Sequence, residues 1–436
     1  MSTPLTDSIN ALTTYANEVT GASDTTLSDA VHTLANGYGG GGTISVIKKD
    51  VNFIDYDGTI LHSYTASEAL ALTALPENPS HDGLTAQGWN WSLSDMKSQV
   101  TEIGKCDIGQ MYITDDGKTR IYVHFEEGRS SPYLGIGVDG SVEVDWGDGS
   151  NTETLTGTSL TNETTAQHIY VSGSYVIKLT VVSGSFSFFG VNNASHILKK
   201  STLPTANISK VYANAVQKIE LGNGITKIGG YAFNSCSSLS SITIPAGVTS
   251  IEGYAFVNCS SLSSITIPAG VTSIGSYVFS SCSSLSSITI PAGVTSIGNN
   301  AFYACSLSSI TIPAGVTSIG GYAFYTCRSF SSITIPDGVT SIGSYAFSSC
   351  VTLSNITISA RVTSIGTNAF NNCYGMAEYH FLPTTPPVIT NKNVFTNIQS
   401  DCIIYVPYSE DHSILNAYKT ASNWSTYASY MQEEAA

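Results

Sequence analysis

Nine cysteines are the residues of this 436-residue chain whose type is most suited to chemistry, as disulfides, metal ligands or nucleophiles. Seven of them recur every 22 or 23 residues, at Cys236, Cys259, Cys282, Cys305, Cys327, Cys350 and Cys373. A zinc site needs clustered ligands of the Cys-x-x-Cys kind, and the chain has none. The spacing instead predicts one shared slot in a repeat, where cysteine packs as a small apolar side chain. Parallel Cα–Cβ vectors in such a ladder suit disulfide geometry poorly, and Cys106 and Cys402 are unpaired extras.

The carboxylates and histidines give little evidence for a metal or catalytic site. Two aspartate pairs stand out, Asp55 with Asp57 and Asp145 with Asp148, but two carboxylates do not supply the roughly six to eight oxygens that calcium takes. Asp57 and Asp148 each precede a glycine, which is typical of tight turns. The eight histidines are scattered, and no HExxH, GxSxG, Walker or dinucleotide motif occurs. We therefore expect no cofactor, no metal and no enzyme, with only an active site of unusual layout left open.

The composition of the chain excludes some classes of binding partner. The chain has 17 Lys and Arg against 32 Asp and Glu, for a net charge of −15, which argues against a nucleic-acid surface. No apolar run approaches the roughly 18 residues of a membrane helix, so we expect no membrane insertion. The first residues lack the basic and apolar regions of an ordinary secretory signal.

A tandem repeat in the second half of the chain predicts the elements that position these residues. An Ile-Pro-Ala-Gly-Val-Thr-Ser-Ile run recurs, and its proline slot is filled by Gly222, Pro245, Pro268, Pro291, Pro313, Pro336 and Ser359. These residues begin seven units, of which the fourth is one residue short. Within a unit, residues 262–268 predict a short strand, with Ile265 and Ile267 facing inward and Ser264 and Thr266 outward. Stacked units share one core, which predicts a solenoid.

These residues resemble the BspA-like leucine-rich repeats of bacterial surface and adhesion proteins. The family pattern is matched by Ala255-Phe256, Cys259, Leu262, Ile265-Thr266-Ile267-Pro268, Val271 and Ile274-Gly275. The resemblance covers residues 222–381 and implies a right-handed leucine-rich-repeat solenoid that serves recognition rather than catalysis. Residues 382–436 look like the terminal cap common in this family, and residues 186–221 are expected to be a connector and N-terminal cap.

Smaller modules are expected before the repeats. Apolar stripes predict a helical hairpin over 1–38, for docking or oligomerisation, with a disordered leader as the alternative; residues 39–42 form a glycine linker. Residues 43–117 open with a hairpin around Asp57-Gly58 and are similar to β-grasp-like repeats of bacterial surface proteins. Residues 118–185 carry Val-Asp-Trp-Gly-Asp-Gly at 144–149 and His-Ile-Tyr at 168–170, which resembles the polycystic-kidney-disease (PKD) domain, an immunoglobulin-like β-sandwich. The predicted fold class is therefore mainly β: a leucine-rich-repeat solenoid preceded by this sandwich and by small α and α+β modules.

The outward positions of the repeat are the candidate ligand-binding face. Strand periodicity brings together the hydroxyls of Ser264, Thr266, Ser287, Thr289, Ser309, Thr311, Ser332, Thr334 and Thr357. A second, aromatic rank is formed by Tyr254, Tyr277, Tyr322 and Tyr345, preceded by Tyr231. Such a flat neutral surface suits a cell-surface glycan or protein. The alternative is that the hydroxyls only keep a strand with few charges soluble.

Three functions remain on the sequence alone. The first is a tail-associated receptor-binding protein of a phage or prophage, made in the bacterial cytoplasm, with the N-terminal segment docked to the virion or self-associated. The second is a BspA-like bacterial surface adhesin that binds host cells or matrix. The third is a structural spacer or decoration protein without a ligand. The absence of a visible signal peptide favours the phage hypothesis. Both the phage and the adhesin hypotheses predict that the solenoid recognises a cell surface.

Overall fold

A computed structural model describes residues 48–126, 130–188, 190–191, 194–195, 197–198 and 210–435. The chain divides into two units, 1–47 and 48–436, and the fold below is that of the second unit. The helical hairpin and glycine linker predicted for 1–38 and 39–42 lie outside the described residues. Within the described residues, no helix has the length and apolar character needed to cross a bilayer.

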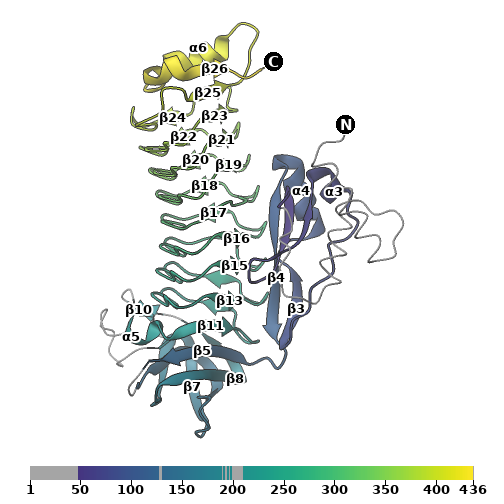
Figure 1. Cartoon of the computed structure of the whole chain (residues 1–436), viewed down its shortest axis with the longest axis vertical. Coiled ribbons are helices and arrows are strands. Elements are labelled where there is room, and N and C mark those ends of the chain that lie inside the picture. The colour runs from purple at the N-terminus through teal and green to yellow at the C-terminus, as the bar shows by residue number, and fades with distance from the viewer. Residues whose placement is uncertain are drawn as a thin grey trace, which may run out of the picture. The chain divides into compact units, whose positions relative to one another are not determined.

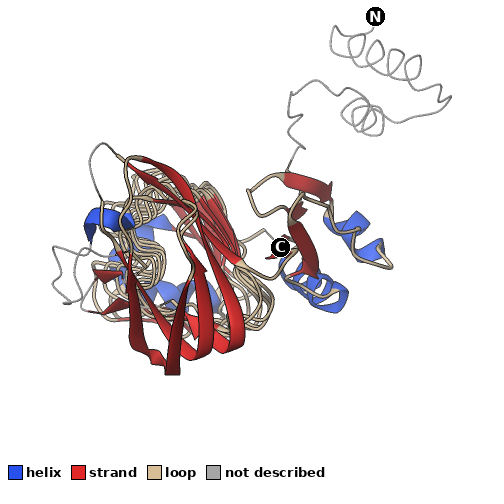
Figure 2. Ribbon diagram, turned by 90° about the horizontal axis from the view of Figure 1, so that it is seen from below, coloured by secondary structure: helices blue, strands red, loops and turns tan. Residues whose placement is uncertain are grey.

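The repeats form a solenoid of parallel strands, and the prediction of a mainly β fold with a repeat solenoid is confirmed (Figure 1). Short strands of neighbouring units pair in parallel, so that Ile265 lies opposite Ile288 and Thr266 opposite Thr289. The ladder is interrupted at residues 309–311, which form no strand. Viewed along the stack, the loops of successive units superpose (Figure 2). The strands of this side are β13 (Ser241–Thr243), β15 (Ser264–Thr266), β16 (Ser287–Thr289), β19 (Ser332–Thr334), β21 (Asn355–Ile358) and β23 (Glu378–Phe381).

Shorter strands line the return side of the units, after the Pro-Ala-Gly turn, except in the third unit, where Ile274 forms only an isolated bridge with Ile297. They are β12 (Lys227–Ile228), β14 (Ser250–Ile251), β17 (Ser296–Ile297), β18 (Ser318–Ile319), β20 (Ser341–Ile342), β22 (Ser364–Ile365) and β24 (Val388–Ile389). The sheet β17-β18-β20-β22-β24 has four pairings, and three of them place identical residues opposite each other, as in Ser318 opposite Ser341. The register of the repeat in sequence is therefore also its register in space.

Ladders of identical side chains fill the interior. Phe279 stacks on Phe302 with ring centroids 5.6 Å apart, and equivalent rings continue the stack in both directions. The slot cysteines are free and buried, and the Cys305 thiol donates to the Phe279 carbonyl at 3.1 Å. Burial raises the pKa of Cys305 to about 12, so this thiol stays protonated and unreactive. The cysteines thus pack as the repeat spacing predicts.

A single sheet joins the solenoid to the segment before it. Its order is β13-β11-β5-β8-β6-β7, with β5 (Thr119–Phe125), β6 (Tyr133–Asp145), β7 (Glu153–Gln167), β8 (Gly173–Ser187) and β11 (Val216–Glu220). The β11 strand pairs antiparallel with β5 and parallel with β13, so sheet and repeats share one core. The two packed sheets of a PKD-like sandwich are not confirmed, because the long strands β6 to β8 pair edge to edge in this one sheet. The connector also contains β9 (Gly190–Val191), β10 (Ala194–Ser195) and α5 (Lys210–Ala213).

A small α+β module precedes this sheet. It contains β1 (Val51–Ile54), β2 (Ile60–Tyr64), α3 (Ala66–Ala71), β3 (Leu84–Trp89), α4 (Leu93–Ile103) and β4 (Cys106–Thr114). The sheet order is β2-β1-β4-β3, with β1 and β4 parallel. Helix α4 begins at an Ser92 cap, whose hydroxyl accepts from the Asp95 N–H, and ends at Gly104 with a φ of 76°. The module has its own core around Phe53, and its β-grasp-like assignment stays a prediction.

The C-terminal residues close the open end of the solenoid. The closing elements are β25 (Ile403–Val406), α6 (Ser413–Thr420), a 3₁₀ helix η1 (Trp424–Tyr430) and β26 (Met431–Glu433). Trp424 is buried against Phe381 and donates its indole N–H to the Pro387 carbonyl at 2.7 Å. Strand β26 adds to β25 as the end of the strand-side sheet. A cap of this kind shields the apolar interior that the last repeat would otherwise expose.

Candidate functional site

The outward hydroxyls of the strands, here called the strand face, are partly covered by the α+β module. Strand β4 contacts β13, β15 and β16, and Thr266 and Thr289 retain only 8% and 2% of their accessible surface. Gly109 of β4 makes this contact possible, since a Cβ there would lie 2.3 Å from Thr289 Oγ1 and 2.4 Å from Thr266 Oγ1. Ser264 is also buried and donates to the Tyr56 carbonyl at 3.2 Å.

The module docks where proline leaves the repeat backbone incomplete. In this parallel ladder the Ile267 N–H donates to the Thr289 carbonyl. By the same pattern the Ile267 carbonyl should accept from the residue in the next proline slot, but Pro291 has no N–H. The carbonyl before each proline slot is therefore left without a donor wherever the next unit begins with proline.

Three consecutive carbonyls of this kind are satisfied by side chains of the module. Asn90 Nδ2 donates to the Ile267 carbonyl at 3.0 Å. Trp91 Nε1 donates to the Ile290 carbonyl at 2.8 Å, and Gln99 Nε2 donates to the Ile312 carbonyl at 2.9 Å. Buried carbonyls need such partners, so the module completes the hydrogen bonding of the repeats that it covers.

The N–H groups of the proline turns are bound in the same way. Gln87 Oε1 accepts from the Ala246 N–H at 2.9 Å, and Gln99 Oε1 accepts from the Ala314 N–H at 2.8 Å. Glu102 Oε1 accepts from the Asp337 N–H at 3.0 Å. These contacts span several units, so the module follows the repeat of the solenoid along its length.

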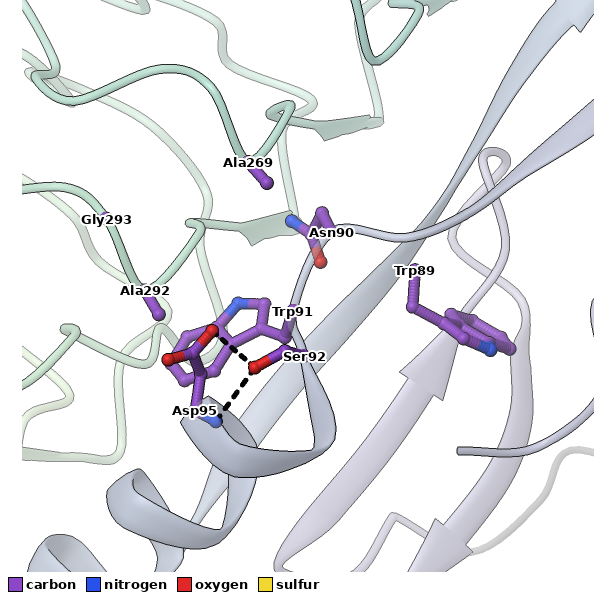
Figure 3. Close-up of a pocket in the computed structure, with 8 residues that line it drawn as sticks. All are labelled: Trp89, Asn90, Trp91, Ser92, Asp95, Ala269, Ala292 and Gly293. Atoms are coloured by element: carbon purple, nitrogen blue, oxygen red, sulfur yellow. Dashed lines mark hydrogen bonds between the residues drawn. The ribbon is translucent and has the colours of Figure 1, made fainter. Parts of the chain in front are cut away.

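A cavity of about 480 Å³ lies along this seam (Figure 3). Trp91 and the start of α4 form one wall, and the turns at Ala269 and Ala292 form the other. The polar groups of Ser92 and Asp95 bond to each other, with Ser92 Oγ 2.7 Å from Asp95 Oδ2. Because these groups are engaged in capping the helix, the cavity is a packing seam of the interface and offers no reactive group.

The remaining strand-face residues lie in different surroundings. Thr311 is buried like Thr266, whereas the other five candidates are half-buried, namely Ser287, Ser309, Ser332, Thr334 and Thr357. Ser309 accepts from Lys48 Nζ at 2.7 Å. The covered hydroxyls are closed to an external ligand in this conformation, so the candidate face is reduced to the units near the C-terminus.

The tyrosine rank lies outside this interface. Tyr254 stacks on Tyr277 and Tyr322 on Tyr345, each with ring centroids 4.6 Å apart and planes within 8° of parallel. Tyr231 extends the first stack, and a pair formed by Tyr303 and Tyr325 flanks the second. Tyr322 is exposed and the rest of the rank is half-buried. No hydroxyl of the four candidate tyrosines bonds to any part of the chain that the structure describes.

The aspartates flagged in the sequence serve local structure. Asp148 pairs with His168 at 2.7 Å and accepts from the Ser150 N–H. Although burial opposes the shift, these hydrogen bonds lower the pKa of Asp148 to about 2. Asp55 is buried and bonds to His81 and Tyr112. Across the described ranges, no group of three or more His, Cys, Asp or Glu side chains is arranged to hold a metal ion.

Sequence reasoning missed the docking residues of the module. Asn90, Trp91 and Gln99 belong to no motif, and nothing in their spacing points to the repeats. An indirect signal was present in the prolines, each of which leaves a carbonyl of a neighbouring unit without its ladder donor. That signal predicts a missing donor but not where the donor comes from.

The fold and its ladders define a leucine-rich-repeat β-solenoid. Residues 209–327 and 295–417 match the family described as "BspA type Leucine rich repeat region (6 copies)". This part of the chain therefore consists of BspA-type leucine-rich repeats. No curated protein matches the chain.

Similar solved structures come from several bacteria. A leucine-rich repeat protein of Bacteroides ovatus is 28% identical over 52% of this chain and 58% of its own, with a TM-score of 0.41. The Treponema pallidum leucine-rich repeat protein is 27% identical over 40% of this chain and 79% of its own, with a TM-score of 0.32. A leucine-rich cell surface protein of Faecalibacterium prausnitzii is 26% identical over 50% and 73%, with a TM-score of 0.31. The match thus spans just over half the length of the B. ovatus protein.

Proposed function

We propose that this chain is a recognition protein of the BspA-like surface-adhesin type, whose repeats bind a glycan or protein on another cell or in its matrix. The tyrosine rank, with the uncovered part of the strand face, is the surface that makes the contact. Rigid aromatic side chains provide large contact area at low entropic cost. BspA-type repeats occur mainly in binding proteins, which favours this role over catalysis.

The backbone conformation of the rank carries the proposal. The backbone φ angles of the four candidate tyrosines lie between 57° and 63°. These residues are Tyr254, Tyr277, Tyr322 and Tyr345. This left-handed region costs a residue with a Cβ about 1–2 kcal/mol, and asparagine tolerates it better. Asn300 and Asn368 fill the same slot in units four and seven. Tyrosine in the other units therefore accepts backbone strain in exchange for a partly exposed aromatic surface.

The matched repeats favour the adhesin over the phage or prophage hypothesis, for which no comparison offers support. We accordingly propose that the protein acts at the bacterial cell surface. The spacer hypothesis differs from both in predicting no ligand. Binding by the intact chain separates these alternatives.

Asparagine substitutions test the rank because the repeat itself contains them. The fluorescently labelled full chain is incubated with a panel of bacteria, epithelial cells and matrix proteins. Tyr322→Asn with Tyr345→Asn should weaken binding by about tenfold or more, as loss of interface tyrosines does. Tyr408→Asn, at an exposed tyrosine of the cap, is the matched control and should bind like the unmodified chain. Unchanged binding of the double variant would exclude the rank, and a lack of binding to every target would favour the spacer.

A further inference from the structure

A second cavity, of about 350 Å³, opens on the uncovered part of the strand face. Glu102 and Ile103, at the end of α4, form one side of it, and Thr334 and Thr357 line the strands opposite. Its volume is in the range of about 300–1,000 Å³ that is usual for small-molecule sites. Unlike the Trp91 seam, it contains polar groups that the protein leaves unpaired.

Ser359 supplies the first unpaired group. It occupies the proline slot of the seventh unit, where five of the other units have proline. Its side chain is 2% exposed and lines this cavity, and its Oγ has no hydrogen-bond partner within the described chain. A buried hydroxyl without a partner is unfavourable, so a ligand that bonds to Ser359 would remove a cost already present.

The Ile335 carbonyl supplies the second. It is the next member of the series formed by the Ile267, Ile290 and Ile312 carbonyls, and Ile335 also lines the cavity. No donor from the described residues reaches it, since neither the Ser359 N–H nor any module side chain bonds to it. The following carbonyl, of Ile358, accepts from the Leu382 N–H at 2.9 Å. The cavity therefore lies at the C-terminal end of α4, beyond the last module side chain that donates to a carbonyl of this series and before the first such donor of the C-terminal segment.

Gln99 shows which chemical group can bind a carbonyl of this series. One unit earlier, its carboxamide N–H binds the carbonyl before the proline slot. At the Ser359 cavity the equivalent partner must bring an amide N–H from outside. It must also offer hydroxyls to Thr334, Thr357 and Ser359, and an apolar group to Leu382, which is 41% exposed. Glu102 accepts hydrogen bonds here and would repel an anionic sugar.

An acetamido sugar combines these features: an amide N–H, an adjacent methyl group and ring hydroxyls. We propose that this cavity binds an N-acetylhexosamine unit of a neutral glycan. The acetamido N–H donates to the Ile335 carbonyl, and sugar hydroxyls bond to Ser359 and the two threonines. The inference rests on the proposed recognition function and names its ligand class.

Matched oligosaccharides test the amide contact. Calorimetry with the full chain compares chitotriose with cellotriose, which differs by having hydroxyls in place of acetamido groups. Chitotriose should bind at least about tenfold more tightly, the difference that one well-formed hydrogen bond in a closed site makes. Hyaluronan fragments, which contain N-acetylglucosamine but also carboxylates, should bind more weakly than chitotriose because Glu102 lines the cavity. Equal binding of the two trisaccharides would overturn the proposal. So would tighter binding of N-acetylglutamine amide, which carries the carboxamide that Gln99 uses one unit earlier.

Two substitutions at one position test the site. Ser359→Pro introduces the residue of the other units and Ser359→Ala removes only the hydroxyl, so neither should lower the melting temperature. Both should weaken chitotriose binding by about tenfold, while Thr363→Ala, on the exposed return side, should not. Unchanged binding by both Ser359 variants would exclude this cavity. Cell binding that survives in them but fails in Tyr322→Asn with Tyr345→Asn would refute the sugar site alone. Chitotriose binding without binding to any cell or matrix would instead refute the proposed adhesin.

Discussion

Gln99 closes the backbone of a repeat turn that lies 213 residues further along the chain, with its Nε2 2.9 Å from the Ile312 carbonyl oxygen. The same side chain accepts from the Ala314 N–H through Oε1. Both halves of one carboxamide are thus used on two backbone groups of a single turn. This pairing makes the α+β module specific for the proline turns of the repeats and not merely adjacent to them.

Removing this carboxamide should loosen the module. We expect Gln99→Ala to cost about 1–3 kcal/mol for the docked state, because it leaves the Ile312 carbonyl and the Ala314 N–H unpaired. Hydrogen exchange of the Ala314 amide measures the effect directly and should become faster. Thr101→Ala, on the exposed side of the same helix, is the control. Equal protection of Ala314 in both variants would mean that the contact does not hold the module in place.

Gly109, in strand β4 of the module, allows a second test of how closely the module packs on the repeats. A Cβ at this position would overlap the hydroxyls of Thr266 and Thr289, and these belong to strands that cannot move independently. Gly109→Ala should therefore separate β4 from the strand face and make residues 264–289 more accessible to hydrogen exchange. Gly247→Ala has no atom closer than 3.9 Å to its new Cβ and should leave exchange unchanged. Identical exchange in the two variants would contradict the close contact.

The sequence predicts the solenoid well and the docked module poorly, for one physical reason. Positions such as Ile265, Cys259 and Phe256 recur in register, so each unit repeats the evidence for where its side chains point. Asn90 and Gln99 bind backbone groups of the repeats. Every residue has a backbone carbonyl, so these contacts do not depend on the residue types of the repeats and cannot be predicted from them. The strand face was therefore predicted as a rank of outward hydroxyls, correctly placed in register, without any sign that another part of the chain covers Thr266 and Thr289.

Stability of the repeat interior should depend on the phenylalanine ladder. Phe302 is fully buried and stacks on Phe279 and Phe324. Phe302→Ala should lower the free energy of unfolding by about 3–5 kcal/mol, because it leaves a cavity between two rings that rigid neighbouring units cannot fill. Chemical denaturation followed by circular dichroism measures this change. Tyr303→Ala, at the adjacent half-buried position, should cost clearly less, and the reverse order would contradict the interior assignment.

The buried thiols should be silent in the folded protein. All nine cysteines are free and buried, and burial raises the pKa of Cys373 to about 12, as it does for Cys305. We expect none to react with a thiol-specific disulfide reagent at pH 8, and all nine to react after unfolding in guanidinium. Absorbance of the released thiolate gives the count. Rapid reaction of several thiols without denaturant would show that the units open far more readily than the packed ladders imply.

The C-terminal cap should be sensitive to pH through His380. Its Nδ1 lies 2.6 Å from Glu434 Oε1 and its Nε2 3.1 Å from Glu378 Oε2. Burial opposes the charged form, but the hydrogen bonds that the His380 ring donates to the two carboxylates prevail and raise the pKa of His380 above its ordinary value of 6.5. A raised pKa in the folded state gives stability that is complete below pH 6.5 and is lost as pH rises through the folded value. Hydrogen exchange in β26 should therefore accelerate as the pH rises above 6.5, after correction for the intrinsic rate, and His380→Gln should abolish this dependence. A variant that kept the full pH dependence would assign it to another group.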